Sequence, residues 1–150
     1  MKLAIGSDHA GLNLKNHLRD MLREEGHEVS DLGTNSPESS DYPDFAERVG
    51  KAVMAGEAEL GVLVCGTGVG VSIAVNKIHG IRAAAVSEPV SARFARSHNN
   101  ANVVCVGERI VGGAVAEEIV HTFLETPFSE GERHVRRINK ITRLEIEPVR

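Results

Sequence analysis

The chain has 150 residues and a formal net charge of −4, and 41% of its residues are hydrophobic but only 3% are aromatic. This acidic balance, with a single tyrosine and no tryptophan, lacks the positive charge and stacking surface of a general nucleic-acid binder. No run approaches the ~20 apolar residues of a membrane helix, and the length is that of one domain, which we expect to span residues 1–150.

The two cysteines, Cys65 and Cys105, each end or lie within an apolar run. No Cys-x-x-Cys pair or Cys/His cluster has the spacing of a zinc site, so we expect no metal. Residues 2–5 already read as a strand, and nothing before them resembles a signal peptide. We therefore expect a cytoplasmic protein with reduced thiols that neither inserts into a membrane nor leaves the cell.

Short apolar runs rich in β-branched residues alternate with amphipathic stretches along the chain. The predicted strands are residues 2–5, 28–32, 60–64, 82–86 and 102–106. The predicted helices are residues 12–25, 43–55, 69–77, 90–97 and 114–124. Near-continuous apolar strands that alternate with helices are typical of a parallel sheet covered on both faces. The sequence therefore predicts one doubly wound α/β domain with a five-stranded parallel sheet.

The last stretch of the chain departs from this alternation. From Glu130 onward the apolar residues have helical spacing, but no strand follows them. We expect a C-terminal helix that lies across the domain or across a neighbouring subunit. Arg133 and Arg137 lie four residues apart, so on a helix they share one face, a geometry suited to holding a phosphate. The alternative is an ordinary solvated face of charged residues.

Polar residues follow several predicted strands, at the edge where open α/β sheets bind ligands. They are residues 6–11, 65–70, 87–89 and 107–109. Asp8 and His9, after the first strand, are suited to orienting hydroxyl groups or exchanging protons, although an Asp before a helix is equally suited to capping it. His98 lies in a polar turn after the fourth predicted helix and is a second acid–base candidate, the alternative being a histidine that only faces solvent.

The sharpest local feature is the segment Cys65-Gly66-Thr67-Gly68-Val69-Gly70. Its alternating glycines permit a tight turn with exposed backbone N–H groups, which favours an anionic ligand. It is not a Walker loop, because no Gly-Lys-Ser/Thr follows, and Val71 stands where a dinucleotide fingerprint has its third glycine. The spacing alone leaves an anion-binding loop and a purely structural turn both open.

Cys65 stands between the third predicted strand and this glycine loop. A thiol beside a helix N-terminus has its thiolate form favoured, and a thiolate can accept a proton. The alternative is a cysteine that only packs as a small hydrophobic side chain, which is how we interpret Cys105. Position, not residue type, makes Cys65 the candidate base.

Six motifs, in this order, together resemble the ribose-5-phosphate isomerase B family, which extends to allose-6-phosphate isomerases and galactose-6-phosphate isomerase subunits. They are residues 6–11 (GSDHAG), 41–43 (DYP), 65–70 (CGTGVG), 87–89 (SEP), 97–99 (SHN) and 131–134 (GERH). The resemblance runs from Met1 to about Ile141. It implies a Rossmann-like three-layer α/β/α sandwich that forms a homodimer or a dimer of dimers with shared active sites, and it implies no metal or nucleotide cofactor.

The resemblance also implies roles for individual residues. Cys65 would be the base at C2 of the sugar phosphate, and Thr67 would assist proton movement. His98 would open the furanose ring, with help from Asp8. The residues that it implies for substrate binding are His9, Arg133 and Arg137 at the phosphate, and Gly66, Gly68, Gly70, Asn99 and Arg109 elsewhere on the ligand, with Asn99 and Arg109 as candidates for contribution from a partner subunit.

Three other functions remain open at the level of sequence. The same isomerisation on a six-carbon aldose 6-phosphate, of allose or galactose, would need only a slightly deeper pocket. A non-catalytic sugar-phosphate sensor would not need a thiol at Cys65 or an imidazole at His98. A thiol-based redox protein is disfavoured, because no resolving cysteine lies close to Cys65.

Overall fold

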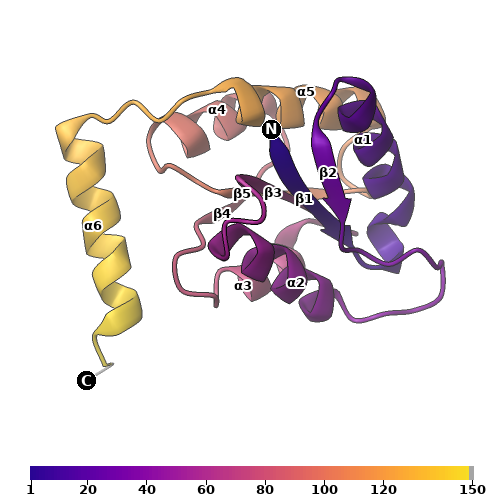
Figure 1. The fold of residues 1–150 in the computed structure, drawn as a ribbon, viewed down its shortest axis with the longest axis horizontal. Helices are drawn as coiled ribbons and strands as arrows, with labels where there is room; N and C mark the ends of the chain where they lie inside the picture. Colours follow the sequence, from indigo (N-terminus) through magenta and orange to yellow (C-terminus); the bar gives the residue numbers. More distant parts are fainter. Residues whose placement is uncertain (149–150) are drawn as a thin grey trace.

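The computed structural model describes residues 1–148, so the last two residues of the predicted domain lie outside it. Five parallel strands form one sheet in the order β2-β1-β3-β5-β4. The strands are β1 (Lys2–Ser7), β2 (Glu28–Asp31), β3 (Leu60–Cys65), β4 (Ala83–Ala85) and β5 (Val103–Gly107). Helices cover both faces of the sheet (Figure 1). The predicted three-layer α/β/α architecture is confirmed.

Six α-helices accompany the strands within the described residues. They are α1 (Leu12–Glu24), α2 (Tyr42–Met54), α3 (Val69–Val75), α4 (Pro89–Ser97), α5 (Gly113–Glu125) and α6 (Glu132–Ile146). Each predicted element is present, with boundaries that shift by no more than two residues. The strands β1, β3 and β5 run further toward their carboxyl ends than predicted, which brings Ser7, Cys65 and Gly107 into the sheet.

Side chains of the sheet alternate between two hydrophobic layers. On β3, Val62 and Val64 pack with residues of α1, α4 and α5, whereas Leu63 and Cys65 pack with residues of α2 and α3. Each fully buried valine or leucine contributes roughly 1.5–3 kcal/mol, so both layers are held by the apolar strands that the sequence predicted. Cys65 is the last residue of the row that faces α2 and α3.

A short 3₁₀ turn, η1 (His9–Gly11), joins β1 to α1 and has no counterpart among the predicted elements. Asp8 caps this turn, because its Oδ1 accepts hydrogen bonds from the N–H groups of Ala10 and Gly11 at 3.0 and 3.2 Å. The capping function considered for Asp8 is therefore confirmed. The cap holds Asp8 and His9 at the carboxyl end of β1.

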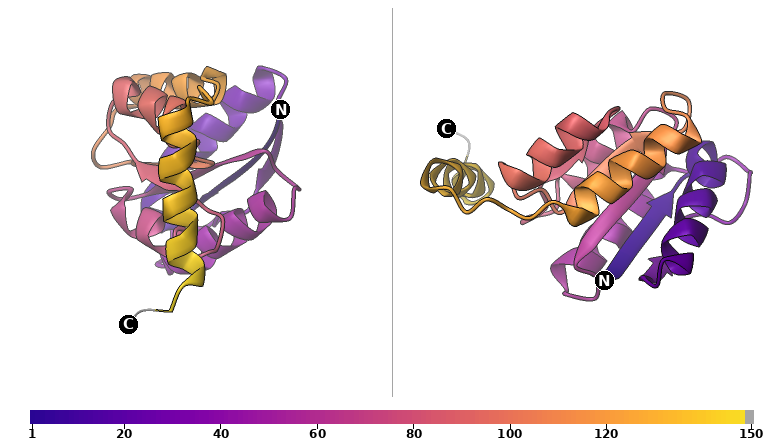
Figure 2. Two further views of the ribbon diagram at one scale, coloured as in Figure 1. Left: turned by 90° about the vertical axis from the view of Figure 1, so that its left-hand side faces the viewer. Right: turned by 90° about the horizontal axis from the view of Figure 1, so that it is seen from above.

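The C-terminal helix α6 stands apart from the rest of the molecule, at the end of a linker that follows α5 (Figures 1 and 2). It meets the body at two points. His134 stacks on His98, and the carboxylate of Glu145 accepts hydrogen bonds of 3.1 Å from the N–H of Gly80. A cavity of about 440 Å³ separates the end of the helix from β4. Among residues 1–148, no helix has the length and apolar character to cross a membrane.

Candidate active site

The candidate site lies at the switch point of the sheet, where β2 lies on one side of β1 and β3, the next strand of the chain, lies on the other side. Ser7 is opposite Val64 in the β1–β3 ladder, so Asp8, which follows β1, and Cys65, the last residue of β3, lie side by side at the carboxyl edge of the sheet. Ligands of open α/β sheets bind in this crevice. A cavity of about 480 Å³ opens here, lined by Asp8, His9, Ala10, Tyr42, Cys65, Gly66, Thr67, Val69, Gly70, Ile73 and Arg109.

Cys65 is 5% exposed, yet it borders the cavity. Its Sγ accepts a hydrogen bond of 3.2 Å from the N–H of Gly68, a contact that stabilises negative charge on sulfur. Gly68 has a φ of +79°, in the left-handed region that favours glycine. A Cβ atom at Gly68 would lie 2.9 Å from the carbonyl carbon of Val106, so the loop also packs tightly on β5. The loop thus turns the N–H of Gly68 toward the thiol.

Cys105 has a different environment, although it lies on the adjacent strand. It is completely buried and borders no cavity that we find in the described part of the chain. Burial, reinforced by the nearby Cys65, raises the pKa of the Cys105 thiol far above its usual range. Cys105 therefore remains a neutral packing residue, as the sequence indicated.

His9 is held by two reciprocal hydrogen bonds to Ser40, in the loop that precedes α2. The backbone N–H of His9 donates to Ser40 Oγ at 3.2 Å, and the N–H of Ser40 donates to His9 Nδ1 at 3.1 Å. Because Nδ1 accepts a hydrogen bond, the proton of the neutral ring lies on Nε2, which can then donate to a ligand oxygen.

Arg109 belongs to the cavity of its own chain. Its N–H donates to the carbonyl of Gly66 at 3.0 Å, and a Cβ atom at Gly66 would lie 3.3 Å from the guanidinium Nη1. The neighbouring N–H of Glu108 donates to the carbonyl of Cys65 at 2.9 Å. The segment after β5 is thereby fastened to the glycine loop, and it brings one positive charge to the cavity.

The structure does not bring His98 into this cavity. His98 follows α4, whose direction opposes that of the strands, and it therefore lies at the amino-terminal edge of the sheet. The five residues of β5 separate the two edges by about 16 Å at roughly 3.3 Å per residue. The His98 ring stacks on His134 with centroids 4.2 Å apart, and Phe94 packs beside it at 4.7 Å.

Asn99, Arg133 and Arg137 also lie at this second edge. Asn99 lines the cavity next to α6, and its carbonyl accepts a hydrogen bond from Arg82 Nε at 3.0 Å. Both arginines lie on α6 and are exposed. Burial, followed by the charges of His98, Arg133 and Arg137, lowers the pKa of His134. The second edge therefore holds a positively charged cluster next to His98.

Tyr42 lines the site and Ser40 holds His9 beside it, but the sequence alone assigned neither of them a role. Tyr42 begins α2 and lies against the glycine loop, where a Cβ atom at Gly70 would be 2.8 Å from Tyr42 Cζ. Both residues also line a cavity of about 500 Å³ beside Asp8 and His9. The Tyr-Pro start of a helix directly after a long polar loop was the available signal. Within residues 1–148, no group of three His, Cys, Asp or Glu side chains is arranged to hold a metal ion.

Comparison with known proteins relates this arrangement to one family. The chain matches the Ribose/Galactose Isomerase family model over residues 3–141. It is 49% identical over 144 residues to ribose-5-phosphate isomerase B of Escherichia coli strain K12, with 96% of each chain covered. It superposes on ribose-5-phosphate isomerase B of Clostridium thermocellum with a TM-score of 0.96 and 49% identity, covering 97% of this chain and 98% of that one.

A further solved structure carries a ligand. Ribose-5-phosphate isomerase B of Mycoplasma genitalium, with bound ribulose 5-phosphate, is 44% identical to this chain, with a TM-score of 0.92. The superposition covers 98% of this chain and 97% of that one. The likeness therefore extends over essentially the whole chain, including the glycine loop, the turn that follows β1 and helix α6.

Proposed function

The chain belongs to the ribose/galactose isomerase family, and from this membership we propose that it interconverts ribose 5-phosphate and ribulose 5-phosphate with Cys65 as the base. This reaction is an aldose–ketose isomerisation. The observation that supports the choice of base is the thiol at the end of β3, which borders the cavity and accepts a hydrogen bond from the Gly68 N–H. No other thiol of the chain borders the cavity, since Cys105 is buried in the core.

The proposed reaction moves one proton between neighbouring carbons. The Cys65 thiolate removes the proton from C2 of the open-chain aldose, and the C1 carbonyl becomes an enediolate oxyanion. The same thiol then returns the proton to C1, while a proton passes from O2 to O1 and a C2 ketone forms. Thr67 lines the cavity beside Cys65 and is the group that we assign to this oxygen-to-oxygen transfer. No electrons leave the substrate, so the chemistry itself requires no redox cofactor.

The glycine loop stabilises the enediolate in this scheme. Charge develops on the substrate oxygens as the C2 proton leaves, and preorganised N–H donors then lower the barrier by about 3 kcal/mol each. The loop residues Gly66, Gly68 and Gly70 bring backbone close to the ligand because they carry no side chains. The left-handed conformation of Gly68 and its contact with β5 hold the loop in place before the substrate arrives.

The remaining residues divide into two groups. Asp8, His9 and Arg109 reach the cavity from the same chain as Cys65 and are assigned to the hydroxyl groups and phosphate. His98, Asn99, Arg133 and Arg137 lie at the other edge, and we assign them to the active site of a second subunit. In a homodimer with shared sites, each subunit supplies Cys65 to one site and His98 with the arginines to the other.

Helix α6 supports this dimeric arrangement. Its apolar residues Ile141, Leu144 and Ile146 are exposed, with 76% of Leu144 accessible. Among residues 1–148, only His134 of this helix is buried. An amphipathic helix that leaves its apolar side chains in water is stabilised when another surface covers them. We propose that a second copy of the chain covers this apolar face of α6, because the same copy would complete the active site. A dimer of dimers would bury additional surface.

Two further proposals concern the cellular location of the enzyme and the extent of its domain. We place the enzyme in the reducing cytoplasm, because Cys65 has to remain a thiol and both cysteines are free. We also treat residues 1–150 as a single sugar-phosphate isomerase domain, since one sheet organises the chain and the family model spans residues 3–141.

A comparison of substrates tests the proposed function. The purified protein is assayed with ribose 5-phosphate, allose 6-phosphate and galactose 6-phosphate, and kcat/KM is measured for each. We expect the highest value for ribose 5-phosphate. A higher kcat/KM for either six-carbon sugar would assign the chain to the allose- or galactose-6-phosphate isomerases instead. No turnover on any of the three substrates would contradict the proposed isomerase function. Product identity is checked by the appearance of the ketose.

A further inference from the structure

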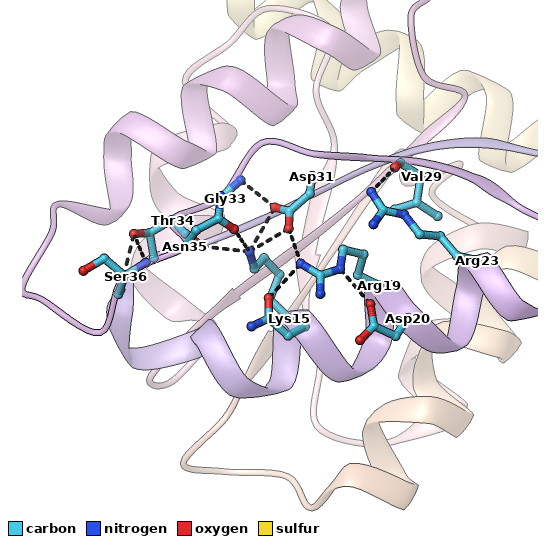
Figure 3. A network of polar contacts seen from close by, with 11 residues as sticks. Lys15, Arg19, Asp20, Arg23, Val29, Asp31, Gly33, Thr34, Asn35 and Ser36 are labelled. Carbon is cyan, nitrogen blue, oxygen red and sulfur yellow. Dashed lines mark hydrogen bonds and ion pairs between the residues drawn. The ribbon is translucent and has the colours of Figure 1, made fainter.

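The ammonium group of Lys15 on α1 is completely buried and has no part in the chemistry proposed above. Its Nζ donates to the two carboxylate oxygens of Asp31 at 3.0 and 2.8 Å, to the carbonyl of Thr34 at 2.7 Å and to Oδ1 of Asn35 at 3.4 Å (Figure 3). A buried ion pair adds little net stability compared with apolar side chains of similar volume. A buried lysine that contacts the end of β2 and two residues of the loop that follows, Thr34 and Asn35, therefore points to a role in fixing the conformation of that loop.

Asp31, at the end of β2, shares this network. It also accepts hydrogen bonds from Arg19 Nη1 at 2.8 Å and from the N–H of Gly33 at 3.0 Å. Burial by itself raises the pKa of Asp31, but the hydrogen bonds from Lys15, Arg19 and Gly33 outweigh it and the pKa is lowered. The carboxylate is thus ionised at neutral pH, and two cations of α1 are paired with the start of the loop.

The segment of residues 32–41, which we call the β2–α2 loop, is held by further hydrogen bonds in addition to those of Lys15. The N–H of Thr34 donates to the carbonyl of Ser7 at 3.0 Å, which ties the loop to the end of β1. The N–H of Ser36 donates to Thr34 Oγ1 at 3.2 Å, and the N–H of Glu38 donates to Ser36 Oγ at 3.1 Å. Successive side-chain-to-backbone bonds of this kind replace regular secondary structure in holding a loop.

The far end of the β2–α2 loop holds a residue of the active site. Ser40 exchanges two hydrogen bonds with His9, and its N–H is the donor that leaves the ring proton on Nε2. His9 lines the cavity with Cys65. A shift of the loop would therefore move the His9 ring and remove the bond that selects its tautomer.

We propose that Lys15 is a positioning residue, which fixes the β2–α2 loop and through Ser40 holds His9 at the substrate cavity as the Nε2–H tautomer. The proposal rests on the proposed function in one respect, the binding of substrate by His9. The tautomer itself does not depend on which substrate is bound, so the two ideas can fail separately.

The kinetic test compares two variants of α1 in which a cationic side chain is replaced by methionine. Lys15→Met keeps the length of the side chain and removes the ammonium group, and we expect KM for ribose 5-phosphate to rise about tenfold with a smaller loss in kcat. The control is Arg23→Met, on the same helix. It removes the hydrogen bond from Arg23 to the carbonyl of Val29 on β2, and Arg23 makes no hydrogen bond to the β2–α2 loop. Its KM should stay within about twofold of the original value. Equal changes in the two variants would contradict the proposal.

A double-mutant cycle separates positioning from general damage. If Lys15 acts through His9, the effect of Lys15→Met on KM should disappear in a His9→Asn background, because the group that it positions is already absent. An undiminished effect in that background would overturn the proposal. If Lys15→Met does not fold, Lys15→Gln serves in the same cycle, since it keeps a polar group in the buried site but removes the positive charge that is paired with Asp31.

A spectroscopic readout is independent of turnover. Nitrogen NMR of the imidazole rings, with His9 assigned by its loss in His9→Asn, should show His9 as the Nε2–H tautomer in the original protein and a mixture of tautomers in Lys15→Met. Unchanged His9 signals would refute the positioning role even if the enzyme is active. The expected tautomer change in a protein that turned over no sugar phosphate would instead refute only the proposed function.

Discussion

The two cysteines of the chain have different surroundings. Cys65 ends its strand, borders a cavity and receives the N–H of Gly68, whereas Cys105 lies within the next strand and is sealed from solvent. Burial raises the pKa of Cys105 and keeps it protonated. A proton carrier has to reach the substrate, and of the two thiols only Cys65 borders the cavity, which is why we propose it as the base.

This difference between the thiols leads to a prediction for single substitutions. Cys65→Ser should lower kcat by at least about a thousandfold, because a hydroxyl is a far weaker acid than a thiol and is not ionised near neutral pH. KM should change little, since the volume is similar. Cys105→Ala is the control, and it should retain turnover while it loses about 1 kcal/mol of unfolding free energy in urea. Near-normal kcat in Cys65→Ser would show that another group is the base.

At the scale of elements, the loop after β3 owes its shape to its contact with β5. Gly68 adopts a left-handed conformation against Val106, and Gly107 leaves room for the backbone of Thr67, where a Cβ atom would come within 2.5 Å. The same two elements are joined by hydrogen bonds from Glu108 and Arg109 to the loop carbonyls. The loop is therefore fixed in advance rather than shaped by the ligand.

A pair of glycines with similar backbone angles tests this packing. Gly68 and Gly56 have φ values of +79° and +76°, but only at Gly68 would an added Cβ atom meet other atoms within 4 Å. Gly56→Ala should cost about 1 kcal/mol, the strain of a left-handed alanine. Gly68→Ala should cost about 3 kcal/mol, because the added methyl also displaces β5 or the loop. Urea unfolding measures both, and equal losses would contradict the packing argument. Activity should fall only in Gly68→Ala.

At the scale of the whole molecule, the candidate residues lie at two opposite edges of the sheet. Asp8, His9 and Cys65 occupy the carboxyl-terminal edge, while His98 occupies the other, where it stacks on His134 of helix α6, the helix that also carries Arg137. Figure 2 shows how α6 stands off from the rest of the molecule. One copy of the chain cannot bring the two groups together without unfolding the sheet between them. Two copies related by a twofold axis can, because each edge of one then meets the complementary edge of the other.

Subunit mixing tests this arrangement directly. Cys65→Ser and His98→Asn should each be nearly inactive alone. When the two variants are dissociated together and reassembled, half of the dimers are mixed and each mixed dimer has one intact site, so activity should recover to about a quarter of the original. Separately reassembled variants are the control. No recovery, with mixed dimers demonstrated by mass spectrometry, would place Cys65 and His98 in the same subunit's site.

Much of the site was predictable because the end of a strand can be recognised in the sequence, where an apolar run gives way to glycine and polar residues. The glycine loop, Cys65 and Asp8 follow apolar strands, and the structure places them together at the switch point. Ser40, Tyr42 and the role of the β2–α2 loop were not predicted, because a serine or tyrosine in a polar segment has no local signature that tells which side chain it meets.

The sequence by itself determined the elements, the alternation of strand and helix, and the contrast between Cys65 at the end of a strand and Cys105 within one, because each depends on the pattern of residues along the chain. Only the tertiary structure decided which candidates share a cavity. Helices of a parallel sheet run back against the strands, so His98, which follows a helix, is carried to the edge opposite Cys65. The burial of Lys15 was likewise settled by packing, since it depends on a strand and a loop that lie far from Lys15 in the sequence and close to it in space.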